Sequence, residues 1–172
     1  MLTRIALLTL LLAPQAGETE PGLVGEYFDF GGGINMFPPN PQKPILVRVE
    51  PKVSFPEVEG DFYGTKLESN FYARWTGLLR VDAAGMHEFS LASDDGSRLL
   101  IAGKPVVDNG GVHAMAEKSG KVELAKGDHE IKVEFFQGGG GAGVVWSWTP
   151  PGGTKQVVPP KALLRFFQAA SS

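Results

Sequence analysis

The sequence predicts an all-β protein, built as an antiparallel β-sandwich or barrel. Its 172 residues include 23 glycines and 13 prolines, and turn signals recur at spacings of about ten residues. Short runs of β-branched and aromatic residues lie between these turns, and helical periodicity is nearly absent. The chain is long enough for one well-formed core and too short for two ordinary domains, so we expect a single domain.

The N-terminal segment is typical of a secretory signal. Met1–Arg4 is basic, and an apolar run over Ile5–Ala13 follows that is too short to cross a bilayer. We therefore expect a secreted, periplasmic or cell-surface protein with no membrane span once the signal is removed. The predicted organisation is a signal peptide over 1–20, one β-domain over 21–167 and a C-terminal tail over 168–172.

Composition excludes several classes of function. The chain has no cysteine, which excludes disulfides and thiolate metal sites. Its net charge is −3 and its lysines and arginines form no basic stripe, so nucleic acid is not an expected partner. Catalysis is not expected either, because the sequence contains no G-x-S-x-G or H-E-x-x-H motif and no cysteine nucleophile.

The first half of the chain predicts a strand, a long loop and a hairpin. Leu23–Phe30 is the opening strand, and the Gly- and Pro-rich segment Gly31–Pro44 is a loop that cannot pair efficiently. Phe71–Val81 and Gly85–Ser93 follow as two strands of a hairpin, because they are joined by the short turn over residues 82–85.

The second half predicts further strands joined by glycine-rich turns. His129–Phe135 has apolar residues at odd positions and charged residues at even ones, which indicates a half-buried antiparallel strand. The other predicted elements are strands over Arg98–Ile101, Glu117–Leu124 and Val144–Thr149, a glycine loop over Gln137–Gly143, and a last edge strand beside the first within Val157–Phe167. Trp75, Trp146 and Trp148 are expected in the core, and His87 and His129 as partly buried sheet residues.

Two adjacent carboxylates, Asp94 and Asp95, lie in a predicted tight turn over Ser93–Leu99. Neighbouring side chains on an extended strand point to opposite faces, so the pair can converge on one ligand only if the backbone is bent or cis. Converging carboxylates repel each other, and a bound Ca²⁺ would reverse that repulsion. Asp-Gly is also a common hairpin turn that needs no metal. The residues alone therefore leave a cation site and a purely structural turn as alternatives.

Six ordered motifs lie between Gly22 and Leu164: Leu23–Phe28, Phe71–Leu79, Ser93–Leu99, Val106–Asn109, Glu134–Gly143 and Trp148–Gly152. Together they resemble the PA14 domain. The resemblance implies a β-sandwich or barrel module of secreted proteins that is not itself catalytic. Members with a known role mostly bind carbohydrate, some through a calcium ion held by an Asp-Asp pair with a cis peptide.

The family's functional positions can be carried over onto this sequence. The resemblance implies a possible Ca²⁺ cofactor and a glycan or polysaccharide partner, including one on a cell surface. The implied metal ligands are Asp94, Asp95, Gln137 and Gly139, and the implied carbohydrate-binding residues are Asp94, Asp95, Asn109, His113, Gln137 and Gly140. Two departures from the family pattern are evident. Adhesin-type members usually have an Asn in the second loop, where Gln137 is here the only side-chain donor, and glycines follow Asn109 where many members have an aromatic residue.

A second function remains open at the level of sequence. In this alternative the chain is a structural or protein-interaction module with no metal or sugar site. The acidic turn is then only a well-capped hairpin, and the surface that matters lies elsewhere, for example on the loop Gly31–Pro44.

Overall fold

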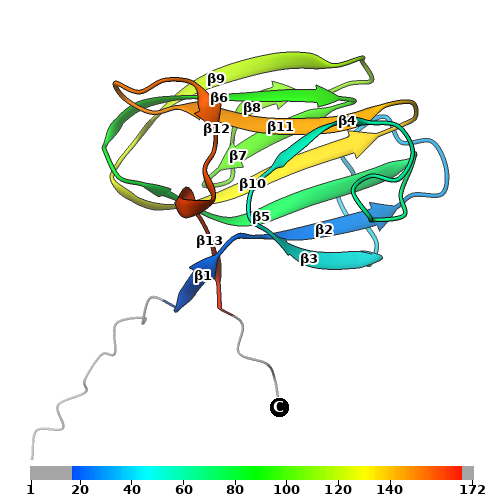
Figure 1. Ribbon diagram of the computed structural model, residues 1–172, viewed down its shortest axis with the longest axis horizontal. Helices are drawn as coiled ribbons and strands as arrows, with labels where there is room; N and C mark the ends of the chain where they lie inside the picture. The colour runs from blue at the N-terminus through cyan, green and yellow to red at the C-terminus, as the bar shows by residue number, and fades with distance from the viewer. Residues whose placement is uncertain (1–16, 168–172) are drawn as a thin grey trace, which may run out of the picture.

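Two antiparallel sheets stack face to face over residues 17–167, the part of the chain that the computed structural model describes (Figure 1). The predicted tail and most of the predicted signal peptide lie outside the described residues. Thr19 and Glu20, the last residues of that signal segment, belong to a short strand, β1. The described residues contain no helix that is both long and apolar enough to cross a membrane.

The first sheet has eight strands and the second has five. The first is ordered β1-β13-β5-β10-β7-β8, with β2 also paired to β5 and β3 to β2; the second is ordered β12-β11-β6-β9, with β4 also paired to β11. The first sheet comprises β1 (Thr19–Pro21), β2 (Leu23–Asp29), β3 (Leu46–Glu50), β5 (Phe71–Val81), β7 (Ser97–Ile101), β8 (Lys104–Asn109), β10 (Gly127–Gln137) and β13 (Leu163–Phe166). The second comprises β4 (Ser54–Val58), β6 (Gly85–Asp94), β9 (Ala116–Leu124), β11 (Ala142–Thr149) and β12 (Gln156–Val157), and a 3₁₀ turn over Pro160–Ala162 precedes β13.

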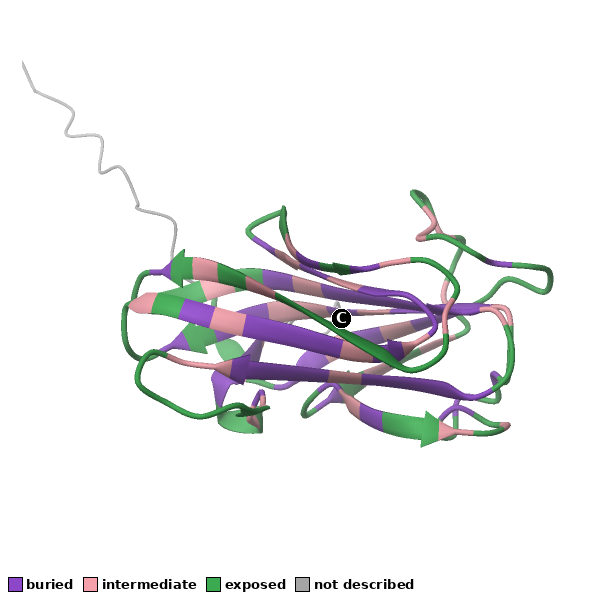
Figure 2. Cartoon of the chain, turned by 90° about the horizontal axis from the view of Figure 1, so that it is seen from above, coloured by how far each residue is buried: buried purple, intermediate pink, exposed green. Residues whose placement is uncertain are grey.

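The core lies between the two sheets and is rich in aromatic residues. Figure 2 shows the buried segments of the strands. Trp75 stacks on Phe55 with ring centroids 5.4 Å apart, which joins the first sheet to the second. Trp146 and Trp148 pack against Phe89 from the neighbouring strand. All three tryptophans are buried, so their predicted place in the core is confirmed.

The predicted strands agree with the observed ones to within two residues, except the last, which covers only Leu163–Phe166 of the predicted segment Val157–Phe167. Two predicted hairpins are wrong. β5 pairs with β10, β2 and β13, whereas β6 lies in the other sheet between β11 and β9. The acidic segment after β6 likewise leads into β7 across the sandwich. A short turn shows that the chain reverses, but it does not specify which sheet receives the next strand.

Other elements differ from prediction for local reasons. The last strand, β13, is not at an edge, because it lies between β1 and β5. Five strands were not predicted, namely β1, β3, β4, β8 and β12. Pro56 interrupts the pattern in β4, and β12 has only two residues, too few for any periodicity.

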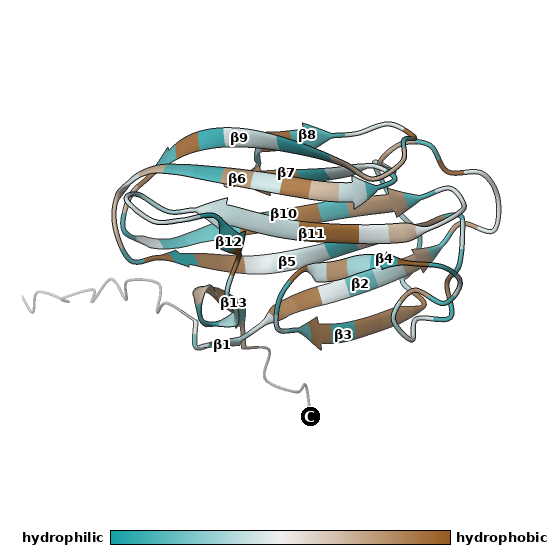
Figure 3. Cartoon of the chain, turned by 45° about the horizontal axis from the view of Figure 1, so that its top comes forward, coloured by the Kyte–Doolittle hydropathy of each residue, from teal (hydrophilic) through white to brown (hydrophobic). Residues whose placement is uncertain are grey.

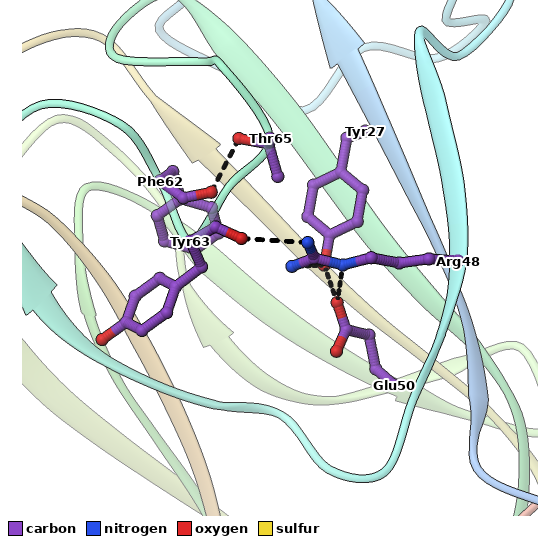
Figure 4. A network of polar contacts seen from close by, with 6 residues as sticks. All are labelled: Tyr27, Arg48, Glu50, Phe62, Tyr63 and Thr65. Atoms are coloured by element: carbon purple, nitrogen blue, oxygen red, sulfur yellow. Dashed lines mark hydrogen bonds and ion pairs between the residues drawn. The ribbon is translucent and has the colours of Figure 1, made fainter.

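A polar network fixes the loop between β4 and β5 against β3 (Figure 4). Glu50 accepts hydrogen bonds from the Tyr27 hydroxyl and from Arg48 Nε. Arg48 Nη1 then donates to the backbone oxygen of Tyr63 at 2.9 Å. At the end of the same loop, the Asn70 N–H donates to the Gly138 oxygen at 3.1 Å. The network thus anchors a loop that ends against the glycine-rich segment.

Candidate functional site

The acidic pair lies at one end of the sandwich, beside the glycine loop. Asp94 ends β6 and is opposite Gly143 of β11, and the Asp94–Asp95 peptide bond is cis. The loop between β10 and β11 lies on one side of the pair, and the loop after β8, which contains His113, lies on the other. The structure therefore brings together the two segments that the sequence predicted to meet.

Asp95 connects these two loops through its carboxylate. Its Oδ1 accepts the N–H of His113 at 2.9 Å, and its Oδ2 accepts the N–H of Gly138, also at 2.9 Å. The residue is only 4% exposed. Because each of its oxygens accepts a backbone donor, Asp95 has a structural role, and one lone pair on each oxygen is still available.

Gln137 organises the glycine loop from inside. Its Oε1 accepts the N–H of Asp95 at 2.7 Å, and its Nε2 donates to the oxygens of Gly139 at 2.8 Å and Gly141 at 3.0 Å. The Gly140 oxygen lies at the limit, 3.5 Å away. Since the Gln137 side chain is fully buried, its first role is to support the site by holding the loop carbonyls next to the acidic pair.

Asp94 lies in an unfavourable electrostatic environment. Partial burial, then the charge of Asp95, then that of Glu57 raise the pKa of the Asp94 carboxyl above its usual value. His113 and a hydrogen bond from the Met115 backbone act in the opposite direction. The ion pairs formed within residues 17–167 do not include Asp94, Asp95 or Glu57. The negative charge here is therefore not balanced by a lysine or arginine.

Glu57 is a component of the site that the sequence did not reveal. It lies on β4, which pairs with β11 beside the glycine loop. Its Oε1 is so close to Gly141 that a Cβ at that position would be 2.4 Å away. Glu57 is far from the acidic pair in sequence, and only the pairing of β4 with β11 brings it near, so no local motif could have identified it.

Asn109 has a different role from the one predicted. Its Nδ2 donates to the Ala116 oxygen at 2.9 Å and to Ser93 Oγ at 3.1 Å, while its Oδ1 has no partner. The residue is fully buried, so it has no surface for the predicted contact with a bound sugar. Asn109 instead supports the loop after β8 through its hydrogen bonds. His113 is partly exposed, and its Nε2 lies 3.0 Å from the Asn109 oxygen.

An apolar rim surrounds this end of the molecule. Met36, Val112 and Met115 are exposed, and the last two lie in the loop after β8, on either side of the His113 N–H that contacts Asp95. A hollow of about 410 Å³ lies beside them between the loop after β2 and the loop after β8; it is lined by Asn35, Met36, Phe37, Asp108, Gly110, Gly111, Lys118 and Phe136. Phe37, from the loop Gly31–Pro44, lies beside Gly110, and its half-buried ring packs against Phe136 and the Arg98 guanidinium.

The donor set suits a hard cation that keeps open coordination positions. Calcium takes six to eight oxygen ligands, and carboxylates and backbone carbonyls are its usual protein ligands. Asp94, Asp95 and the carbonyls of the glycine loop are donors of this kind. Within the described part of the chain no cluster of three or more His, Cys, Asp or Glu side chains could hold a metal alone. A calcium ion here would therefore need backbone oxygens, water or ligand hydroxyls to complete its shell.

Comparison with known proteins supports the predicted fold and family. A model of the PA14 domain family matches residues 20–162. The chain is similar to the PA14 domain of the MpAFP antifreeze protein, with a TM-score of 0.78 and 17% identity over 90% of this chain and 96% of that one. It is also similar to a PA14 sugar-binding domain from an RTX adhesin, with a TM-score of 0.73 and 20% identity over 84% of this chain and 98% of that one. The predicted all-β antiparallel fold is confirmed.

A curated relative is much longer than this chain. The anti-sigma-I factor RsgI3 of Acetivibrio thermocellus is 27% identical over 146 residues, which are 84% of this chain. The match covers 21% of that relative, so the chain spans about a fifth of its length.

Proposed function

Because the chain belongs to the PA14 domain family, we propose that it is a non-catalytic carbohydrate-binding module that acts outside the cytoplasm. Its ligand is a glycan or polysaccharide, bound at the end of the sandwich that carries Asp94 and Asp95. A calcium ion bridges the protein and the sugar there. Asp94, Asp95 and carbonyls of the glycine loop are its protein ligands, and neighbouring hydroxyls of the sugar complete its oxygen shell.

The observation that carries this proposal is the unbalanced negative charge at an open rim. Asp95 and Glu57 lie close enough to Asp94 for their charges to raise its pKa. Within residues 17–167 none of these three residues forms an ion pair. A divalent cation removes this repulsion. The rim also offers Phe37 and Met36 for contact with the apolar CH face of a sugar.

Similar proteins support the same class of ligand. One similar domain is described as sugar-binding, and another similar domain comes from an epithelial adhesin of Candida glabrata in complex with β-lactose. The latter has a TM-score of 0.67 at 12% identity, so it supports the scaffold and not a particular sugar. The sugar that this chain prefers must therefore be found by experiment.

The decisive experiment measures calcium binding and glycan binding separately. Thermal melting is followed with millimolar calcium and with a chelator, and a glycan array is probed under both conditions. We expect calcium to raise the melting temperature and array binding to require it. An Asp94→Asn variant should lose both effects and keep its fold. The matched control is Asp82→Asn, because Asp82 is an exposed aspartate in the turn before β6, at the other end of that strand.

Asp94 is a better target than Asp95 for this test. Replacing Asp95 with Asn would remove an acceptor from one of two backbone donors and disturb the flanking loops whether or not a metal binds. A melting temperature that does not respond to calcium would refute the proposed calcium binding. An array without binding under both conditions would refute the carbohydrate ligand and favour a protein-interaction module.

A further inference from the structure

The free edge of the first sheet carries an unusual set of apolar residues. β3 pairs with β2 on one side only. Val47 and Val49 on β3, and Ile45 directly before it, alternate with less exposed residues and are 55%, 50% and 56% exposed. Figure 3 shows β3 at the border of the sheet as a largely hydrophobic strand. Alternate residues share one face of a strand, so the three side chains form a single apolar row.

The other edge strands of the described chain are protected against pairing. β8 begins with Lys104 and Pro105, and β4 contains Pro56 and Glu57. β9 is rich in charged side chains, and β8 approaches it so closely that a Cβ on Gly120 would be 1.8 Å from the Val106 oxygen. β1 and β12 have three and two residues. Lysine, proline, charge and short length are the usual devices that prevent edge-to-edge pairing.

β3 has none of these devices facing outward. Leu46–Glu50 contains no lysine and no proline. Its two charged residues, Arg48 and Glu50, form an ion pair with each other and belong to the network with Tyr27. An apolar and unprotected edge strand is a template for pairing with another strand.

We propose that β3 is a self-association edge, at which two copies of this chain pair their β3 strands antiparallel about a two-fold axis through Val47. In this register Val47 faces Val47 of the second copy, and Ile45 faces its Val49. All three exposed apolar residues then have apolar partners. On the other face Arg48 is opposite Leu46 of the second copy, so no like charges are directly opposed.

The groove beside β3 extends this surface. It has a volume of about 1020 Å³ on the outer face of the first sheet, and its apolar wall includes Val24, Val47, Val49 and Phe166. Pairing of two β3 strands would place two such walls next to each other. Because the two-fold axis pairs the same edge of both copies, no free β3 edge remains after pairing. The assembly therefore closes as a dimer and does not grow into a fibre.

Light scattering and sedimentation from about 1 to about 100 µM test the proposal, since weak dimers form in this range. We expect a concentration-dependent shift from monomer to dimer. Val47→Lys should weaken dimerisation by about tenfold or more, because it puts two like charges on the axis. Met86→Lys is the control, since Met86 is 53% exposed on another strand. A chain that stays monomeric throughout, or a dimer that Val47→Lys leaves unchanged, would overturn the proposal.

Cysteine cross-linking tests the register, because the chain has no cysteine of its own. Val47→Cys alone should form a disulfide-linked dimer under mild oxidation. Ile45→Cys and Val49→Cys should cross-link when mixed and much less when each is alone. Val112→Cys, at a residue that is 65% exposed elsewhere, gives the background level. Equal cross-linking at Val47 and Val112 would contradict the register and the proposal.

Discussion

At the scale of single residues, Asp94 gives the clearest pH prediction. Its pKa is raised in the folded state by partial burial and by the charges of Asp95 and Glu57. Its protonated form therefore stabilises the fold, and this contribution is lost as the pH rises through the raised pKa. Without calcium, Asp94→Asn should raise the melting temperature at neutral pH. This gain should disappear below the ordinary carboxyl pKa of 3.8, where the native residue is protonated in both states.

Calcium should reverse this behaviour in the native chain. A bound cation favours the ionised carboxylates, so the rise in melting temperature on adding calcium should be large at neutral pH and vanish in acid. Melting curves over a pH series, with calcium and with chelator, provide the measurement. Asp82→Asn should follow the native chain throughout. A calcium effect that is independent of pH would show that the ion does not bind at these carboxylates.

Gln137 gives a prediction about stability. Replacing it with Ala removes the acceptor for the Asp95 N–H and the donor that holds the Gly139 and Gly141 carbonyls. Buried groups that lose their partners cost about 1–3 kcal/mol each, so we expect Gln137→Ala to lower the free energy of unfolding by about 2–4 kcal/mol. Urea denaturation measures it, with the exposed Gln42→Ala as control. A loss equal to that of the control would contradict the supporting role.

The same residues show how far sequence reasoning reaches into the site. Adjacent carboxylates and a glycine run are local patterns, so Asp94, Asp95 and the segment after Gln137 could be identified directly. The burial of Asn109 and the nearness of Glu57 depend on strand pairings between distant segments. Such pairings leave no local signal, which is why one residue was assigned the wrong role and the other was missed.

At the scale of elements, the pairing of β4 with β11 controls the site through Gly143. A Cβ at this position would lie 2.8 Å from the backbone of Glu57, which cannot move without displacing β4. Gly143→Ala should therefore cost about 1–3 kcal/mol of stability and weaken calcium binding, because Gly143 is also opposite Asp94. Urea denaturation measures the loss of stability, and calorimetry measures the calcium binding.

The control for this prediction is Gly139→Ala in the adjoining loop. Nothing lies within 4 Å of a Cβ added there, so its stability should be close to that of the native chain. If both variants behave alike, contact between β4 and β11 does not position the acidic pair. The contrast separates a steric effect on one strand pair from a general loss of loop flexibility.

The sequence predicts where strands begin and end better than it predicts which strands pair with each other. The alternation in β10, with apolar residues such as Ile131 and Val133 facing the core, depends on only a few consecutive residues. The partner of β5 does not: it is β10, far along the chain, and not β6, which follows at once. Stacking two sheets buries the inner faces of both strands, and this gain is invisible in the turn that joins them.

At the scale of the whole molecule, the two ends of the described chain lie together and far from the site. β1 pairs with β13, and the Phe167 N–H donates to the Glu18 oxygen at 2.7 Å. β13 pairs with the end of β5 at Leu78 and Leu79, whereas the glycine loop adjoins the start of β5 at Phe71. Figure 1 shows β1 and β13 side by side, projecting from the edge of the sandwich. Attachments at either end should therefore leave the site unchanged.

Circular permutation tests this separation. A short linker from residue 167 to residue 17 closes the chain, and new ends can be opened within the turn over residues 82–84 or between Gly139 and Gly140. The first permutant should keep its fold and its calcium response, because this turn lies at the end of β6 remote from Asp94. The second should lose the response while the core still folds, because the cut frees carbonyls that Gln137 holds in place. Melting curves with calcium and chelator distinguish them, and a calcium response surviving in the second permutant would contradict the role of the glycine loop.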